Sequence, residues 1–240
     1  MTDFDPMPSD WERALGVVAH PDDLEYGASA AIAAWTEAGK SVAYVLATRG
    51  EAGIDGIPPE ECGPLREREQ IEAARVVGVS TVEFLDHHDG VIEYGLPLRR
   101  DLAAAIRRHR PELIVTLNGD PWPGGRPNSP DHRNVAQALM DAVGDAGNRW
   151  IFPELGLEPW NGVRWVAVSG SPNATHAVAV ESTLDLGMAS LAAHKAYLEG
   201  LGPGPMSDPS FIRRFAVENG ERFGGKPAIA FQLIPFAFEG

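Results

Sequence analysis

The feature that most constrains this chain is an apolar run, residues 15–19, that stops at His20-Pro21-Asp22-Asp23. The run has the composition of a buried strand. The segment GASAAIAAWTEAGK that follows has helical spacing of its apolar residues, and its last glycine is placed where helices often end. A second strand-like run, SVAYVLAT, comes next. This strand–helix–strand order predicts a parallel pair of strands and an α/β fold.

The same alternation continues along the chain. The patterns predict an open, mostly parallel sheet covered by helices on both faces. One domain is expected over residues 1–240, with residues 1–12 as a flexible N-terminus, and the stretch GLGPGPMSDPS is expected to be a loop. The expected strands are 13–19, 41–48, 81–85, 113–117, 163–169, 177–180 and 228–236, and the later helices are 64–79, 96–110, 131–143 and 182–198.

Composition limits the partners. The formal net charge is -14, which repels nucleic acid and anionic membranes and favours a small-molecule partner. Cys62 is the single cysteine, so no intrachain disulfide can form. Residues 1–10 lack the pattern of a signal peptide, and no apolar run approaches the roughly 20 residues of a membrane span. We expect a cytoplasmic protein without membrane insertion. A homo-oligomer is possible.

Chemistry-bearing side chains follow two of the expected strands. His20, Asp22 and Asp23 come at the end of the first strand. The strand 113–117 leads into NGDPWPGGRPNSPDH, a loop that ends in His132 at the start of a helix. Ligands of open α/β sheets bind beyond the carboxyl ends of the strands. We therefore expect His20, Asp23 and His132 to meet around one metal ion.

Two imidazoles and a carboxylate suit zinc in a catalytic site that keeps a position for water, and they also suit iron(II). Asp22 would point away from Asp23 if the backbone is extended there, and it could then act as general base beside that water. The alternative is structural: adjacent carboxylates often cap a following helix, and a histidine there is often a surface group.

Several motifs resemble the PIG-L/LmbE-like zinc-dependent N-deacetylases. AHPDDLEYG is similar to the family signature AHPDD-x-E, and TRGEAG (48–53) to its T-x-G-E-x-G turn. REREQIEAARVVGV, FLDHHDG and PDHRNVAQAL follow in the family's order, and LAAHKAYL is a looser match to a late A-x-x-A-H-x-[ST]-Q helix. The resemblance covers about residues 13–140 well and the rest weakly.

The resemblance implies an LmbE-like fold, a Rossmann-like three-layer α/β/α sandwich. It implies one Zn²⁺ held by His20, Asp23 and His132, with Asp22 as general base. The implied reaction is hydrolysis of an N-acetyl amide, usually on an N-acetylglucosamine-type sugar or glycoconjugate. Alternatives are an amidase acting on a sugar–thiol conjugate and a non-catalytic sugar-binding member. A nucleotide-binding module is disfavoured because no G-x-G-x-x-G follows the first strand.

One position departs from the family pattern. Many members carry a histidine where this chain has Ser129, and that histidine helps to stabilise the oxyanion or to protonate. Arg66, His194 or a loop group could substitute, so Arg66, Ser129 and His194 are the expected substrate-binding residues. Asp131 could orient a ligand or cap the helix, and capping is the favoured role of the two.

The remaining candidates carry less information. Glu51 could orient a ligand histidine, whereas His87 and His88 are expected at the rim of the site. The loops 54–63, 118–129 and 151–162 are expected to decide the substrate, with Trp122, Trp150 and Trp160 in or near them.

Overall fold

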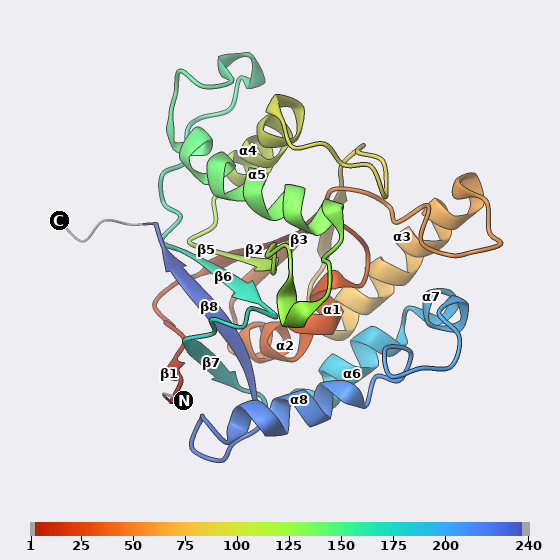
Figure 1. Cartoon of the computed structure of the whole chain (residues 1–240). Coiled ribbons are helices and arrows are strands. Elements are labelled where there is room, and N and C mark those ends of the chain that lie inside the picture. The colour runs from red at the N-terminus through yellow and green to blue at the C-terminus, as the bar shows by residue number, and fades with distance from the viewer. Residues whose placement is uncertain (1–2, 237–240) are drawn as a thin grey trace.

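The computed structural model describes residues 3–236, and a central sheet dominates it (Figure 1). The strands are β1 (Asp5–Pro6), β2 (Arg13–Val18), β3 (Ser41–Leu46), β4 (Thr81–Phe84), β5 (Leu113–Leu117), β6 (Trp165–Ser169), β7 (His176–Ala179) and β8 (Ala228–Pro235). Within the described residues they form one eight-stranded sheet in the order β1-β7-β8-β6-β5-β2-β3-β4. Strand β8 runs antiparallel to β6 and β7, and the other neighbouring pairs of this sheet are parallel.

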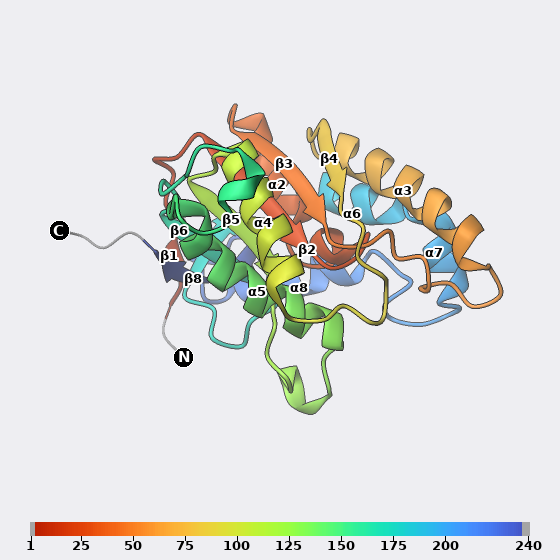
Figure 2. The ribbon, with the colours of Figure 1, turned by 90° about the horizontal axis from the view of Figure 1, so that it is seen from above.

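Helices cover both faces of this sheet, which confirms the predicted α/β fold class. Helices α4 and α5 pack on one face, and α1, α2, α3, α6 and α8 contribute to the core on the other. Figure 2 shows α3 beside the β4 edge. The helices are α1 (Asp23–Gly27), α2 (Ser29–Glu37), α3 (Pro59–Val76), α4 (Leu96–His109), α5 (Pro130–Gly147), α6 (Leu184–Ala192), α7 (Lys195–Gly200) and α8 (Phe211–Gly220), with short 3-10 turns η1 (Pro123–Gly125) and η2 (Pro153–Leu155).

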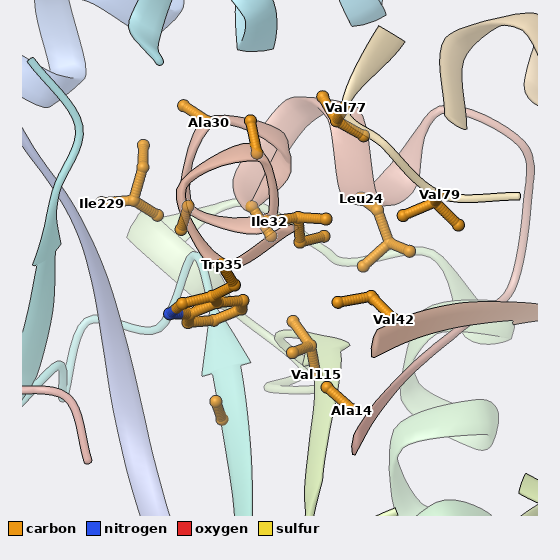
Figure 3. Close-up of a cluster of buried hydrophobic side chains, with 14 of the residues drawn as sticks. Ala14, Leu24, Ala30, Ile32, Trp35, Val42, Val77, Val79, Val115 and Ile229 are labelled. Atoms are coloured by element: carbon orange, nitrogen blue, oxygen red, sulfur yellow. The ribbon is translucent and has the colours of Figure 1, made fainter. Parts of the chain in front are cut away.

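The period of two along the strands explains why both faces are buried. In β2, Leu15 and Val17 join the core under α4 and α5, whereas Ala14 and Val18 join the core on the opposite face. That second core is drawn in Figure 3, where Trp35 of α2 lies over the sheet. None of the described helices combines the length and the apolar character that a membrane crossing requires.

The N-terminal segment differs from the expectation. Residues 3–12, expected to be flexible, are packed against the domain, and residues 1–2 lie outside the described part. Strand β1 pairs with β7, and the side chains of Phe4 and Trp11 are buried. The Trp11 ring meets Trp35 edge-on at 5.4 Å between centroids. An acidic, proline-containing stretch looks unstructured by composition, but its two aromatic residues supply enough apolar surface to hold it in place.

Two helical regions also differ from what the sequence predicted. The helix expected over 182–198 is divided into α6 and α7 at His194, whose φ of -79° and ψ of 58° are not helical. Helix α8 follows directly on the predicted Gly/Pro-rich loop and was not expected. It is positioned by Phe211, Ile212 and Ala216, which are buried in the core on the same face of the sheet as α2.

The strand order places the predicted site at a switch point of the sheet. Strand β2 lies between β3 and β5, so the chain proceeds from β2 toward β4 in one direction and from β5 toward β6 in the other. The connections leaving β2 and β5 therefore diverge, which opens a crevice beyond their carboxyl ends. Residue 20 and the loop 118–129 lie at this edge, as the sequence predicted.

Arg107 of α4 holds the opposite end of α5. Its buried guanidinium donates hydrogen bonds to the carbonyl groups of Asp145, Ala146, Asn148, Ile151 and Phe152, at 2.8–3.3 Å. These carbonyls end α5 and begin the segment 148–162. An 18-residue helix is about 27 Å long, so the loop 151–162 with Trp160, and Trp150 beside it, lie far from His132 at the first turn. The expectation that this loop decides the substrate is wrong for that reason.

We expect Arg107→Met to lower the free energy of unfolding by about 3 kcal/mol, because several buried carbonyl groups lose their donor. For a chain of this size, that loss lowers Tm by roughly 6–12 °C. Arg100→Met, on the exposed face of the same helix, is the control and should change stability by less than about 1 kcal/mol. Denaturant unfolding of both variants measures the difference, and equal effects would contradict this role of Arg107.

Candidate metal-binding active site

The structure brings His20, Asp23 and His132 together. His20 follows β2, Asp23 begins α1, and His132 lies in the first turn of α5. The Nε2 atom of His132 lies 3.2 Å from Nδ1 of His20 and 3.1 Å from Oδ1 of Asp23, and His20 Nδ1 lies 3.6 Å from Asp23 Oδ2. Ligand atoms about 2.0–2.1 Å from a tetrahedral zinc ion lie about 3.3 Å apart. These three side chains therefore have the spacing of a metal-ligand set.

The second nitrogen of each ring fixes the tautomer. His20 Nε2 faces carboxylate oxygens of Asp131 and Asp89, each at 3.1 Å, and His132 Nδ1 lies 2.9 Å from Oδ1 of Asn128. Since these partners accept hydrogen bonds, the outer nitrogens carry the protons. The lone pairs of His20 Nδ1 and His132 Nε2 then point toward each other and toward Asp23. These lone pairs repel one another, and a cation bound between them would remove the repulsion.

Electrostatics support a positive charge at this point. Burial opposes a charge on His20, but hydrogen bonds to Asp131, Asp23 and Asp89 outweigh it and raise the pKa of His20, so a positive charge is favoured at Nδ1, carried either by a proton or by a metal ion. Burial likewise disfavours the charged form of Asp23. The charges and hydrogen bonds of His132 and His20 are stronger and hold the pKa of Asp23 well below its usual range. Two oriented imidazoles beside an ionised carboxylate can hold a divalent metal.

Asp131 orients His20 and does not cap α5, so the favoured capping role is wrong. The cap is Ser129, whose hydroxyl accepts a hydrogen bond from the Asp131 amide. The Asp131 carboxylate is fully buried and accepts from the amides of Gly90 and Ile92, at 2.7 and 3.1 Å. Asp131 is the second residue of α5, and its side chain faces His20 after β2. Ser129, two residues earlier, caps the helix instead.

Asp22 lies beside the ligand set with its backbone in a left-handed conformation, φ 88° and ψ -24°, so the backbone is not extended there. Its Oδ2 accepts a hydrogen bond of 2.8 Å from Nη2 of Arg66. Burial raises the pKa of Asp22 to about 7, with the charge of Arg66 opposing and that of Asp23 adding to the shift. Asp23 points elsewhere, because its Oδ2 accepts from the amides of Ala19 and His20. The two neighbouring carboxylates are therefore in different environments.

Arg66 of α3 is almost fully buried and holds three groups at once. Besides Asp22, its guanidinium donates to the carbonyl of Pro21 at 2.7 Å and to that of Gly50 at 3.0 Å. A Cβ atom on Gly50 or Gly53 would overlap Nη1 of Arg66, so both glycines leave the space that the guanidinium occupies. The TRGEAG turn thus encloses the arginine that contacts Asp22.

A pocket of about 360 Å³ joins these groups. Besides the metal-ligand set and Asp22, its lining includes two tyrosines that were not predicted, Tyr26 and Tyr197. Arg66 stacks on the Tyr197 ring with its Cζ 4.2 Å from the centroid. The pocket is lined by His20, Asp22, Asp23, Tyr26, Gly53, Arg66, Asp89, Leu117, Ser129, His132 and Tyr197.

Comparison with known proteins agrees with this geometry. The sequence model of the PIG-L family, described as GlcNAc-PI de-N-acetylase, matches residues 15–143, more than half of the chain. The chain belongs to the PIG-L family. The matched range contains the three candidate ligands, Asp22 and Arg66, whereas Tyr197 lies beyond it.

Among curated relatives, the diacetylchitobiose deacetylase of Thermococcus kodakarensis is 26% identical over 96% of this chain and 86% of its own length. A 1D-myo-inositol 2-acetamido-2-deoxy-alpha-D-glucopyranoside deacetylase of Kineococcus radiotolerans is 33% identical over 62% of this chain and 49% of its own length. The solved N,N'-diacetylchitobiose deacetylase of Pyrococcus horikoshii superposes with a TM-score of 0.84 at 24% identity, covering 94% of this chain and 85% of that one. This last likeness confirms the LmbE-like fold.

Of the other candidate residues that the sequence indicated, some line the pocket and others do not. Arg66 and Ser129 line the pocket, and their contact with substrate stays a prediction. His194 is fully buried and faces Glu25, at 3.7 Å, so its expected substrate-binding role disagrees with its position. Glu51 contacts neither ligand histidine; its carboxylate accepts from the amides of Asp89 and Arg49.

Sequence reasoning missed Asp89, Asn128, Tyr26 and Tyr197. Asp89 lies in the FLDHHDG motif, which could have indicated it, because that segment was matched to the family without a role for its aspartate. His87 and His88 beside it lie outside the pocket lining. Asn128 is four residues before His132, and nothing in its local sequence distinguishes it from a loop asparagine.

We expect Gly53→Ala to displace the Arg66 guanidinium, because the added methyl group occupies the position of Nη1. Gly53 itself is exposed, but the guanidinium that it meets is buried, so overpacking against Arg66 should lower stability by about 1–3 kcal/mol. Gly144→Ala is the control: its Cβ meets nothing within 4 Å in the helix α5, so stability should rise by about 0.5–1 kcal/mol. A crystal structure of Gly53→Ala that retains the Asp22–Arg66 hydrogen bond would contradict the steric argument.

Proposed function

We propose that this protein is a zinc-dependent N-deacetylase that hydrolyses the N-acetyl amide of an N-acetylglucosamine-type sugar or glycoconjugate. The observation that carries the proposal is the buried Asp22 carboxylate beside three oriented metal ligands in one pocket. Membership of the PIG-L family and the named activities of the deacetylase relatives support the substrate class. A cytoplasmic location and a homo-oligomer stay predictions.

The donor set fits zinc. His20, Asp23 and His132 are nitrogen and oxygen donors at tetrahedral spacing and would hold the ion. Each imidazole is supported through its second nitrogen, as metal-binding histidines usually are. When bound, zinc supplies Lewis acidity, which polarises a carbonyl group and lowers the pKa of water.

The residues of this chain handle the proton. Asp22 accepts the proton of the attacking water at a carboxylate oxygen and then transfers it to the nitrogen of the departing amine. Burial raises the pKa of Asp22, which favours a carboxylate that accepts a proton and later releases it. Arg66 fixes the carboxylate from the buried side, so its reactive oxygen does not rotate away from the substrate.

Ser129 replaces the histidine that helps to stabilise the oxyanion in many family members. Tyr197 supplies a neutral hydrogen-bond donor in its place. Burial, with a contribution from the charge of Asp22, raises the pKa of Tyr197 well above its usual range, so the hydroxyl keeps its proton. Its stacking on Arg66 fixes the ring in the pocket. We assign to this hydroxyl a hydrogen bond to the acetyl oxygen as negative charge develops there.

The first test separates base from ligand. Asp22→Asn should retain zinc and lose roughly 100- to 10,000-fold in rate, because the proton acceptor is gone while the ligands remain. Asp23→Asn should lose zinc and activity together, and excess zinc should partly restore the rate. Acetate release from N-acetylglucosamine-type substrates and zinc content are measured on the same samples.

If Asp22→Asn loses the metal while Asp23→Asn keeps it, the two roles are exchanged. Sugar binding without turnover by the zinc-loaded wild type would instead support a non-catalytic binding protein. Turnover confined to a sugar–thiol conjugate would move the substrate class to that amide.

The second test concerns Tyr197. Tyr197→Phe should lower kcat roughly 100-fold with zinc retained, since one hydrogen-bond donor to the transition state is lost. Tyr26→Phe is the matched control, because the Tyr26 hydroxyl is already engaged with the carbonyl of Met206 at 2.7 Å. Similar losses in both variants would argue against a specific role for Tyr197.

A further inference from the structure

The backbone amide of Asp22 has a buried partner that the proposed reaction does not use. The amide donates a hydrogen bond of 2.9 Å to Oε1 of Gln70, a residue of α3. Both residues are buried, and Asp22 is one of the few non-glycine residues of the described chain with positive φ. Such a conformation persists only where the surroundings hold it.

The orientation of the Gln70 amide follows from chemistry. Because the Asp22 amide is a donor, the Gln70 atom facing it is the oxygen, and the Nε2 group must face the other way. There it donates a hydrogen bond of 2.9 Å to Oε1 of Glu25 in α1. The other oxygen of Glu25 lies 3.7 Å from Nε2 of His194, which immediately precedes α7. A buried line thus runs from His194 through Glu25 and Gln70 to the Asp22 backbone.

None of these three side chains lines the pocket, so they do not touch a substrate there. Glu25, Gln70 and His194 are each at most 1% exposed. A carboxylate and an imidazole are expensive to bury, and an apolar core would serve packing alone better. The two hydrogen bonds of Gln70, one from the Asp22 amide and one to Glu25, connect these buried groups to Asp22, whereas His194 and Glu25 lie 3.7 Å apart without a hydrogen bond.

We propose that Gln70 is a positioning residue for Asp22, itself held by its hydrogen bond to Glu25; the inference rests on the proposed function of Asp22 as general base. Without the Gln70 oxygen, the buried amide of Asp22 loses its acceptor and the left-handed conformation loses its support. The residue then relaxes toward negative φ, and its carboxylate turns away from Arg66 and the pocket. Asp23 is not displaced, because the amides of Ala19 and His20 hold its carboxylate independently.

The test is Gln70→Met, which conserves volume and removes the acceptor. In the zinc-loaded full chain we expect kcat to fall roughly 100-fold, the scale of a misplacement of about 1 Å, with KM and zinc content little changed. In an Asp22→Asn background the same substitution should cause no further loss. Ser190→Ala is the matched control: it removes another fully buried hydrogen bond to α3, to the carbonyl of Ala73, and should leave kcat unchanged.

Two substitutions of Glu25 test its hydrogen bond to Gln70. Glu25→Gln keeps an oxygen for the Gln70 amide and should retain kcat within about 10-fold, whereas Glu25→Leu should approach the loss of Gln70→Met. Should Gln70→Met not fold, Gln70→Asn keeps the amide and is one methylene too short to reach both partners, so the same measurements apply.

A crystal structure of the Gln70 variant gives a readout that does not depend on turnover. Residue 22 is expected at negative φ, and the hydrogen bond between its carboxylate and Arg66 is expected to be broken. Retention of φ near 88° and of that hydrogen bond, or losses that add fully to those of Asp22→Asn, would overturn the inference. A wild-type protein inactive on every N-acetyl substrate would instead refute the proposed function, while the structure would still decide the positioning.

Discussion

The candidate site depends on the carboxylate of Asp131. It is fully buried and joins the first turn of α5 to two other segments: it accepts from the amides of Gly90 and Ile92 after β4, and it faces Nε2 of His20 after β2. Fixing His20 through Nε2 leaves Nδ1 free toward Asp23. The ligand geometry is thereby set by the protein before any metal arrives, which lowers the cost of ordering the site on binding.

The buried charges of this site are a cost to fold stability. Asp22, Asp23, Asp89 and Asp131 cluster around two imidazoles and Arg66, and isolated buried carboxylates are costly. The hydrophobic clusters on the two faces of the sheet offset that cost, and the sheet carries the strand ends from which the site extends. The strained backbone of Asp22 adds to the cost, and such strain is commonly found where function requires a particular side-chain direction.

Much of this arrangement could be predicted from the sequence because it follows from periodicity. Strands β2, β3 and β5 are apolar on both faces, and parallel pairing brings their carboxyl ends to one edge, so His20 and His132 were expected to meet. Helix α8, by contrast, follows a Gly/Pro-rich stretch, and its burial depends on Phe211 meeting the distant residue Tyr26 at 5.5 Å between ring centroids. Local patterns do not contain such contacts.

The errors at the site have a common cause. Asp131 is at a position typical of a helix cap, but the carboxylate is used by groups 39 to 111 residues away in sequence. His194 is in an alanine-rich segment that resembles an uninterrupted helix, and the helix ends there beside Glu25. The positive φ of Asp22 has no sequence signal, since aspartate also adopts extended and helical conformations. In each case a tertiary partner decides among locally acceptable conformations.

The pocket is assembled from two parts with different constraints. The candidate ligands, Asp22 and Arg66 belong to the range that matches the PIG-L model, where the end of β2 and the buried helices α3 and α5 hold them in place. The pocket is also lined by Tyr197 of α7, outside that range, and by Tyr26, whose hydroxyl donates a hydrogen bond to the carbonyl of Met206. Figure 2 shows the loop between β5 and α5, which ends at Ser129, projecting from the body of the molecule. Loops tolerate sequence change that strand ends do not. Differences in substrate among proteins of this fold are therefore expected to arise on the α7 side and in the loop before α5, while the chemistry at the ends of β2 and β5 stays the same.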